Sequence, residues 1–432
     1  MLKKIKFSYA WVIIGLCFMM IGVSLGLCSS GRNIYLTAIT DALNIPRGAF
    51  SVNHSIRFVT SALINLYFGR LVARYGTKKL ICAGFVCLIA FALINSFASQ
   101  LYLFYIASIF LGIGLSWTGT SMVSTIINRW CTSNKGTITG AVLAANGLGG
   151  AIAVQILSPI IFQPGNPFGY RDSYHLVSLV LLVALVMICI FYKERPSQSD
   201  NSSDVPVKKR KARGEGWVGM DYSDALKKPY FYLTAVCIFL TGIGLQGLGG
   251  VVTPHMYDVG LSKEYVAAIT SISSILLMAT KFSAGFSYDR FGMRFSMNMC
   301  LVSSFLSLIG AIFISNTPVG RTIALVRIIF GNVALPLETV MLPLYVSEMF
   351  GNKSFDKVLG VFVSVNYVGF ALGSPIGNVC YDIFGDYKVS FVIFGVAMLF
   401  VTIAMQYSLT AAHRDKKEIL ADVEKENKQV VC

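Results

Sequence analysis

The sequence predicts an all-α membrane protein with twelve transmembrane helices, arranged as two six-helix bundles related by pseudo-symmetry. Three observations support this fold class. The 432 residues are 55% hydrophobic and only 13% charged, with a mean hydropathy of +0.66, which is more apolar surface than a water-soluble core can bury. Apolar segments recur along the whole chain, and one short loop motif occurs in both halves of the sequence.

Twelve apolar segments have the length of about 20 residues that a helix needs to cross a bilayer. They cover residues 9–31, 49–68, 79–98, 101–125, 137–162, 173–192, 230–254, 265–287, 295–315, 320–344, 357–381 and 388–410. The first segment follows several lysines and therefore resembles a signal peptide. Its apolar run exceeds the ~7–15 residues of a signal-peptide core, and a bulky Leu27 precedes Cys28, so we expect it to remain as a membrane helix.

The stretch between the sixth and seventh segments is rich in Lys, Arg, Ser and Asp and lacks helical apolar periodicity. It predicts a linker between two halves. The expected domains are an N-terminal six-helix bundle at residues 1–193, a cytoplasmic linker at 194–228, a C-terminal six-helix bundle at 229–411 and a cytoplasmic tail at 412–432.

The formal net charge is +15, and the basic residues are unevenly placed. They gather before the first segment, after the second and fourth segments and in the linker, which all lie on one predicted side of the membrane. Cytoplasmic loops carry such an excess of Lys and Arg. The sequence therefore predicts a multi-pass protein of the plasma (inner) membrane with both termini cytoplasmic, and no nucleic-acid partner.

The ten cysteines are scattered, mostly inside apolar segments, without the paired spacing of a metal site. We expect them to pack as small apolar residues rather than to form disulfides or bind a metal. The sequence has no Ser/His/Asp arrangement, no metal-spaced His cluster and no phosphate-binding loop. It therefore predicts no catalytic residue, no metal and no cofactor, and the chain is not expected to be an enzyme.

A ten-residue loop motif follows the second segment of each half. Residues 69–78 read Gly-Arg-Leu-Val-Ala-Arg-Tyr-Gly-Thr-Lys, and residues 285–294 read Gly-Phe-Ser-Tyr-Asp-Arg-Phe-Gly-Met-Arg. The repeat indicates duplication of a six-helix unit. Glycines allow a tight turn, and cations can brace helix ends. The predicted inner-loop gating residues are Gly69, Arg70, Arg74, Gly76, Lys78, Gly285, Asp289, Arg290, Gly292 and Arg294.

Both copies match the Gly-x-Leu-Ala-Asp-Arg-x-Gly-Arg-Arg pattern of inner loops, and over essentially its whole length the chain resembles the major facilitator superfamily. One departure is Ala73, which replaces the acid of the first copy, whereas Asp289 keeps it in the second. Within the superfamily the chain is most similar to the monocarboxylate porter and oxalate:formate antiporter group. Residues 9–12, 128–130, 136–150, the region of residue 281, and residues 360–362 and 373–375 carry that likeness.

Lys281 is the main candidate for binding a substrate. It lies in the eighth segment on one helical face with Thr270 and Ser274. An ammonium on a polar stripe can bind a carboxylate. In the resembling group this position usually holds an arginine that binds the substrate carboxylate, whereas lysine is a point charge without a bidentate fork. The alternative is a lysine that extends to the inner surface of the membrane.

Arg57 is the second cationic candidate. It lies in the second segment on a stripe with Asn53, His54, Ser61 and Asn65, which is too polar to face lipid. The stripe either lines the transport pathway or packs against a neighbouring helix. His54 is a candidate for proton coupling because histidine titrates near neutral pH, although a structural role is an alternative.

Arg327 and Glu338 lie on one face of the tenth segment, about 16 Å apart along the helix axis. The resemblance implies that Arg327 is structural, because arginine is common early in this helix, and a cavity cation is the alternative. Glu338 is one of few membrane-embedded acids and is the leading candidate to carry a proton. Pairing of Glu338 with a neighbouring cation is the alternative.

Two positions depart from what the resemblance implies. Proton-coupled monocarboxylate porters carry an acid one turn before the helix 8 cation, where this chain has Leu277. Oxalate exchangers carry a lysine in helix 11, where this chain has Asn366, which we retain as a substrate-binding candidate. Trp117 and Tyr35 are further cavity-lining candidates, although Tyr35, like Tyr345, also fits the aromatic belt at the membrane interface.

Six glycines are expected to form close-packing surfaces between the halves. They are Gly147, Gly149, Gly150, Gly369, Gly373 and Gly377.

These patterns together predict a secondary transporter that moves a small organic anion by alternating access, as a symporter or antiporter. A monocarboxylate is favoured over a dicarboxylate, with a proton or a counter-anion as the coupled species, and the protein is expected to act as a monomer in the lipid bilayer. The alternatives are an exporter of drugs or other amphipathic compounds, and a transport-inactive membrane sensor.

Overall fold

The computed structural model describes residues 9–30, 32–131, 133–194 and 219–430, so most of the predicted linker lies outside the described residues. The described part is almost entirely helical, with one isolated bridge between Gly219 and Gly351. Eleven of its helices are long and apolar enough to cross a membrane, and there are twelve if the pair Val52–Leu66 and Phe68–Tyr75, bent by 58°, counts as one span. The predicted all-α membrane fold is confirmed.

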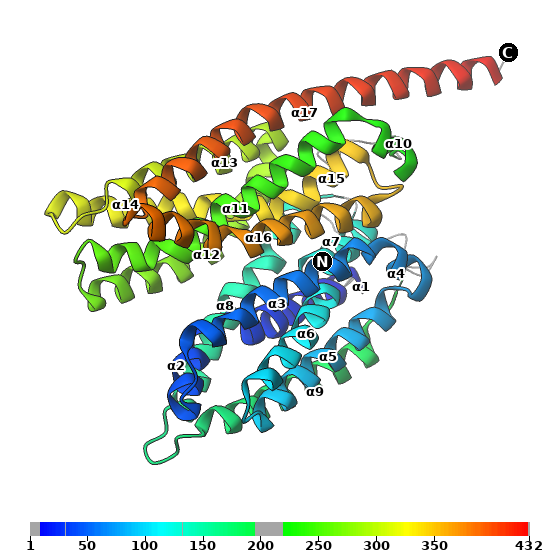
Figure 1. The fold of residues 1–432 in the computed structure, drawn as a ribbon. Helices are drawn as coiled ribbons and strands as arrows, with labels where there is room; N and C mark the ends of the chain where they lie inside the picture. The colour runs from blue at the N-terminus through cyan, green and yellow to red at the C-terminus, as the bar shows by residue number, and fades with distance from the viewer. Residues whose placement is uncertain (1–8, 31, 132, 195–218, 431–432) are drawn as a thin grey trace, which may run out of the picture. The chain divides into compact units, whose positions relative to one another are not determined.

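The first half contains six spans and one short connecting helix (Figure 1). The spans are α1 (Tyr9–Ile21) with the π-helix η1 (Gly22–Ser30), α3 (Arg47–Leu66) with α4 (Phe68–Tyr75), α5 (Thr77–Phe97), α6 (Leu101–Thr118) with α7 (Thr120–Trp130), α8 (Lys135–Ile161) and α9 (Gly169–Phe191). Helix α2 (Arg32–Leu43) connects the first two spans.

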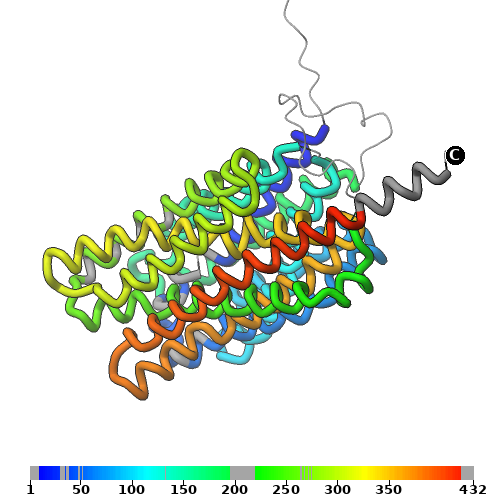
Figure 2. The backbone as a smooth tube through the Cα atoms, turned by 90° about the horizontal axis from the view of Figure 1, so that it is seen from above, coloured from blue at the N-terminus to red at the C-terminus, as the bar shows by residue number. Residues whose placement is uncertain are grey.

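The second half repeats this layout after a short helix, α10 (Tyr222–Lys227). Its spans are α11 (Pro229–Asp258), α12 (Lys263–Phe291), α13 (Met293–Ile312), α14 (Pro318–Ala334) with the π-helix η2 (Leu337–Met341) and α15 (Leu342–Phe350), α16 (Phe355–Phe384) and α17 (Lys388–Val430). Helix α17 lies along α11 and α13 and continues beyond them toward the C-terminus (Figure 1, Figure 2).

The backbone forms two compact units. The first comprises Met1–Lys208 with Ser274–Phe286, and the second comprises Lys209–Ser273 with Ser287–Cys432. The same helix pairs form in each. In the first, α8 packs on α1 and η1, and α5 packs on α6 and α9; in the second, α16 packs on α11, and α13 packs on α14 and α17. This repeated pairing is the structural form of the predicted pseudo-symmetry.

The pairs η1–α8 and α11–α16 are in contact through glycines. A Cβ on Gly26 would lie 2.7 Å from the Cα of Gly149, and a Cβ on Gly373 would lie 2.6 Å from the Gly247 nitrogen. Main chains approach this closely only where side chains are missing. We call these two contacts the glycine seams.

The predicted location was wrong for five of these six glycines, whose neighbours lie within the same half: Gly149 and Gly150 face η1, whereas Gly369, Gly373 and Gly377 face α11. Gly147 does meet the other half of the sequence, because a Cβ there would lie 3.3 Å from the Met278 Cβ atom of α12. The sequence showed that small residues share a helix face, but that pattern does not identify the helix that the face meets.

Two membrane spans are interrupted where the regular α-helical hydrogen bonding of the backbone stops. Pro336 lies between α14, which ends at Ala334, and η2, which begins at Leu337, and its ring nitrogen cannot donate a helical hydrogen bond. The ladder resumes in the wider π-helical form, which carries Glu338. Gly119 separates α6 from α7 in an extended conformation.

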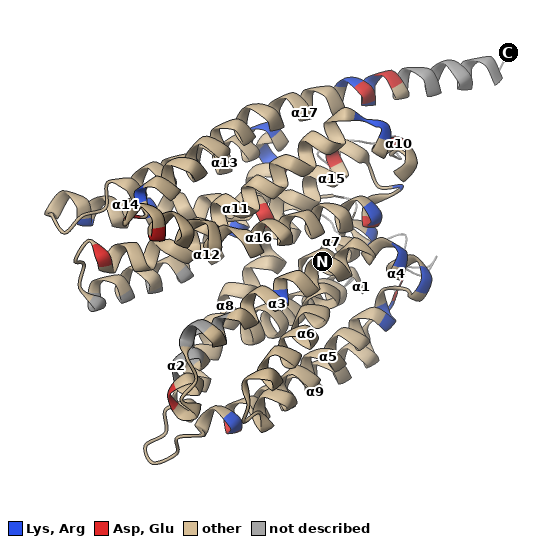
Figure 3. Cartoon of the chain, viewed as in Figure 1, with Lys and Arg blue, Asp and Glu red and all other residues tan. Residues whose placement is uncertain are grey.

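Figure 3 shows few charged residues along the lengths of the helices, with the basic residues of α4 at one end of their bundle.

Candidate functional site

Each copy of the predicted loop motif turns at its second glycine, but the residues before that glycine are helical: residues 69–75 belong to α4 and residues 285–291 belong to α12. Gly76 lies between α4 and α5 with φ +78°, and Gly292 lies between α12 and α13 with φ +88°. These left-handed values favour glycine over any residue with a Cβ. Each motif therefore reverses the chain between two membrane spans.

The motif cations contact groups within their own unit. The guanidinium groups of Arg70, Arg74 and Arg290 lie over neighbouring aromatic rings at 5.9, 5.4 and 5.4 Å. Lys78 donates a hydrogen bond to the Cys189 carbonyl oxygen at 2.9 Å, and Arg294 donates one to Thr410 Oγ1 at 3.1 Å. Asp289 is half-buried, Gly69 is buried in α4, and a Cβ on Gly285 would collide with the Gly136 carbonyl oxygen.

The first copy lacks an acid at Ala73, but the fold brings another acid to the same turn. Glu194, just past α9, accepts a 2.6 Å hydrogen bond from the backbone N–H of Thr77, the first residue of α5. A Cβ on Gly76 would occupy the space of the Glu194 carboxylate. A carboxylate here also interacts favourably with the positive end of the α5 dipole. Glu194 was not predicted from the sequence. The only hint was that the first motif copy has Ala73 where an acid is expected, so that an acid from elsewhere in the chain could take its place.

Lys281 is buried in α12, with 4% of its surface exposed. This disagrees with a lysine that extends to the membrane surface. The surrounding segment Ser274–Phe286 belongs to the first unit, where a Cβ on Gly140 of α8 would lie 2.5 Å from the Lys281 carbonyl oxygen. The side chain of Ser274, predicted to share this face, lies outside the described residues.

Arg57 is also buried, and its Nη1 donates a 2.6 Å hydrogen bond to Ser29 Oγ of η1. Its guanidinium carbon lies 4.3 Å from the ring centroid of Phe58, and the ring of His54 meets the same phenyl group edge-on at 4.6 Å. Arg57 and His54 are thus brought together around one aromatic ring.

The other end of the α3 stripe is used for packing. Ser61 donates to the Gly112 carbonyl oxygen at 3.0 Å, and Asn65 Nδ2 donates to Ser116 Oγ at 3.0 Å. Ser121 completes the network by donating to Asn65 Oδ1 at 3.2 Å. Of the two interpretations of the stripe, helix packing therefore describes Ser61 and Asn65.

Tyr35 and Trp117 do not join Arg57 at one described site. The Tyr35 hydroxyl lies 2.5 Å from Ser173 Oγ, and its ring stacks on Tyr174 at 4.2 Å. The buried indole nitrogen of Trp117 has no hydrogen-bond partner among the described residues.

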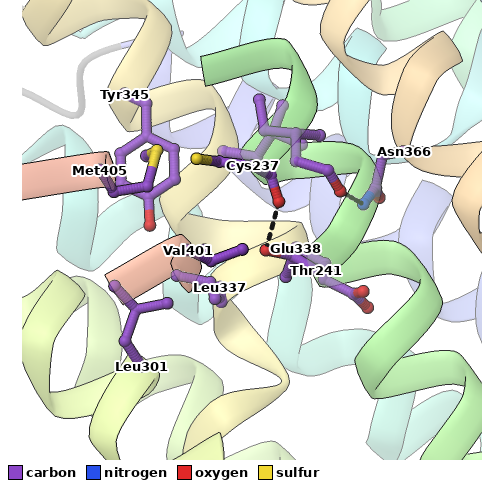
Figure 4. A pocket seen from close by; sticks show the side chains of 11 residues that line it. Cys237, Thr241, Leu301, Leu337, Glu338, Tyr345, Asn366, Val401 and Met405 are labelled. Carbon is purple, nitrogen blue, oxygen red and sulfur yellow. Dashed lines mark hydrogen bonds between the residues drawn. The ribbon is translucent and has the colours of Figure 1, made fainter. Parts of the chain in front are cut away.

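The second unit contains a small cavity of about 10 Å³ that brings Glu338 and Asn366 together (Figure 4). It is close to the smallest space that holds one water molecule. Its lining residues are Cys237, Ile238, Thr241, Leu301, Leu337, Glu338, Leu342, Tyr345, Asn366, Val401 and Met405.

Glu338 has incomplete hydrogen bonding in this cavity. Its Oε2 accepts a 3.4 Å hydrogen bond from Gln246, whereas its buried Oε1 has no partner among the described residues. The alternative that Glu338 pairs with a cation has no support among the described ion pairs. Asn366 donates to the Ile238 carbonyl oxygen at 3.2 Å.

Tyr345 is 2% exposed and lines this cavity, which agrees with a cavity-lining role rather than with a place in the membrane-interface belt. Its hydroxyl also has no hydrogen-bond partner among the described residues. Arg327 is elsewhere in the second unit: it is buried, lies outside the cavity lining, and donates to Ser307 Oγ of α13 at 3.4 Å.

Comparisons with known proteins are consistent with this architecture. A family model described as Major Facilitator Superfamily matches residues 12–344 and 234–430. An uncharacterised transporter of Bacillus subtilis, YcxA, is 22% identical over 60% of each chain. Human Monocarboxylate transporter 2 is 21% identical over 95% of this chain and 88% of its own, and Multidrug resistance protein 2 of Bacillus subtilis is 23% identical over 76% and 78%.

A solved structure of the Escherichia coli fucose:proton symporter FucP superimposes with a TM-score of 0.70. It is 16% identical and covers 93% of this chain and 99% of its own. At that identity the likeness concerns the fold.

Proposed function

Because this chain belongs to the Major Facilitator Superfamily, a family of secondary transporters, we propose that its cargo is a small organic anion, with a monocarboxylate favoured over a dicarboxylate. The bound anion is exposed in turn to each side of the membrane by alternating access.

The main support for this proposal is that more basic than acidic side chains are buried in the described part of the chain. Among the described residues the buried cationic side chains are Arg57, Lys281 and Arg327, whereas the only buried carboxyl is that of Glu338. Ionisable groups are expensive to hold in a membrane protein and are kept where they serve a pathway or pair with another charge. An excess of buried positive charge favours an anionic cargo.

Lys281 is the proposed primary carboxylate ligand. Its ammonium is a compact point charge, which suits one carboxylate oxygen better than a planar bidentate pair. Arg57 is the proposed second cation, and its bond to Ser29 holds the guanidinium in place. A single primary cation favours a monoanion.

Glu338 is the proposed proton carrier. The cavity around it has room for about one water, so it is too small for an organic acid and suits a proton or water instead. One carboxyl oxygen has no hydrogen-bond partner within the described part of the chain. His54, beside Arg57, is the second candidate for this role.

The orientation follows from the basic loops. We propose that the inner-loop motifs and both termini face the cytoplasm of a cell with this protein in its plasma (inner) membrane.

Export of amphipathic drugs is the second candidate function. The name of Multidrug resistance protein 2, whose identity to this chain equals that of the monocarboxylate transporter within a few per cent, favours it. The two functions differ in their need for a buried cation, since a neutral amphipathic cargo does not require Lys281.

Counterflow in proteoliposomes tests the proposal, with formate, lactate, pyruvate, oxalate, malonate and aromatic acids as cargo. We expect Lys281→Ala to lower kcat/KM for the active acid by about 10- to 100-fold, the loss expected for a charge-assisted hydrogen bond. Lys353→Ala is the matched control, because Lys353 is half-exposed and pairs with Asp221 at the surface. Absence of exchange with every acid, or a silent Lys281→Ala in a folded protein, overturns the proposal.

A further inference from the structure

Two thiols meet in the first unit, away from the proposed transport residues. The Sγ atom of Cys82 in α5 lies 3.6 Å from the Sγ atom of Cys189 in α9. The two helices pack against each other, so the backbone holds the pair in place. Both cysteines are free thiols.

The separation of the sulfurs fits a shared ligand better than a bond between them. A disulfide requires about 2.05 Å between the sulfurs. Two sulfurs bound to one tetrahedral or trigonal-pyramidal centre, with bonds of about 2.3 Å, lie roughly 3.5–3.8 Å apart. The observed 3.6 Å is close to that spacing, and thiolates prefer soft ions.

We propose that Cys82 and Cys189 form a two-thiol binding site for a thiophilic metalloid, with trivalent arsenic in a monoorgano compound as the best match. Such a centre needs only two sulfurs besides its carbon substituent. This agrees with the described residues, in which no group of three or more His, Cys, Asp or Glu side chains is placed to hold a metal ion.

The surroundings suit such a ligand. Cys189 is exposed and Cys82 is partly exposed on the outside of the bundle, so a membrane-permeant reagent reaches both sulfurs. The Lys78 ammonium donates to the Cys189 carbonyl oxygen at 2.9 Å, which keeps a positive charge near the sulfurs.

The binding step is a condensation. An organoarsenic(III) oxide, R–As=O, forms two As–S bonds, while the two S–H bonds break and both protons leave with the oxide oxygen as one water molecule. Arsenic remains trivalent, and no oxidant or reductant takes part.

Phenylarsine oxide is the probe, applied to the full-length protein in detergent or liposomes and followed by protection of cysteines from maleimide, mapped by peptide mass spectrometry. We expect Cys82 and Cys189 to be protected together. Because the second sulfur binds intramolecularly, Cys82→Ser and Cys189→Ser should each weaken binding at this site by about 100-fold or more.

Cys87→Ser is the matched control. Cys87 lies on the same helix as Cys82 and is also partly buried, so its loss should leave protection of the pair unchanged. A dithiol such as ethanedithiol should reverse the protection, whereas an equal concentration of a monothiol should not.

Independent protection of Cys82 and Cys189 at different probe concentrations overturns the proposal. So does undiminished protection of the remaining cysteine in either serine variant. The wild-type mapping needs no substitution, and therefore it decides the question even if a serine variant does not fold.

Discussion

The backbone N–H of Thr77 donates a 2.6 Å hydrogen bond to the carboxylate of Glu194, which joins the start of α5 to the chain just beyond α9. The bond closes the inner-loop turn of the first half with an acid that comes from outside the motif. Ala73 therefore does not leave this turn without a carboxylate.

Glu194→Ala should destabilise the protein by about 1 kcal/mol, the usual effect of losing a side-chain acceptor at a helix N-terminus. The thermal unfolding midpoint in detergent measures it. Glu194→Gln keeps an oxygen acceptor and should recover most of the loss. An alanine variant as stable as the wild type would contradict this role.

Glu338→Gln should lower uptake driven by a pH gradient to near the level of empty vesicles and change exchange at equal pH much less, because exchange needs no net proton movement. Parallel flux assays in proteoliposomes compare the two modes. Glu418→Gln is the control, since that exposed side chain pairs with Arg414. Equal losses in both modes discard Glu338 as the proton carrier.

Gly149→Ala should destabilise the first half by about 1–3 kcal/mol, because the added Cβ collides with the backbone of Gly22. Gly15→Ala, where nothing lies within 4 Å of the added atom, should be neutral or stabilising by up to about 1 kcal/mol. Gly373→Ala and Gly249→Ala form the same comparison in the second half. The measurement is the thermal unfolding midpoint of each of the four variants. If the seam variant and its control have equal midpoints in either half, that seam does not stabilise the protein.

Asp386, between α16 and α17, should stabilise the protein at neutral pH and lose that effect in acid. Burial alone would raise the pKa of Asp386, but the Lys388 N–H, at 2.9 Å, and the charges of Lys388 and His255 hold it below the usual value. A carboxyl whose folded pKa is depressed stabilises above its unfolded pKa, and that stability disappears as pH falls through the folded pKa.

Asp386→Asn should therefore lower the thermal midpoint at pH 7 and converge with the wild type as the pH drops below about 4. Asp224→Asn is the control, because Asp224 pairs with Lys227 at an exposed site. A midpoint difference that persists unchanged in acid would show that the charge of Asp386 is not the cause.

The sequence predicted the twelve spans well because bilayer thickness imposes a length and an apolar composition that a single chain displays directly. It did not predict α2 or the breaks at Gly119 and Pro336. Helix α2 is short and carries polar residues, and both breaks depend on local backbone hydrogen bonding.

The sequence predicted individual residues of the candidate site, but it did not predict which residues from different helices lie together. Helical spacing identified which residues share a face, as for Arg57 and His54. It could not identify Gln246 beside Glu338, because Gln246 comes from another helix, α11. Contacts between segments distant in sequence depend on how helices pack, which one sequence does not display.

The glycine seams also determine where this protein can change during evolution. A helix pair in main-chain contact has no intervening layer of side chains that could absorb a larger residue, so almost every substitution there is felt along both helices. The side chains of Asn366 and Tyr345 line a space of about 10 Å³, so a substitution there need not press on another main chain. Substitutions should therefore accumulate at such lining positions, while the seams stay glycine.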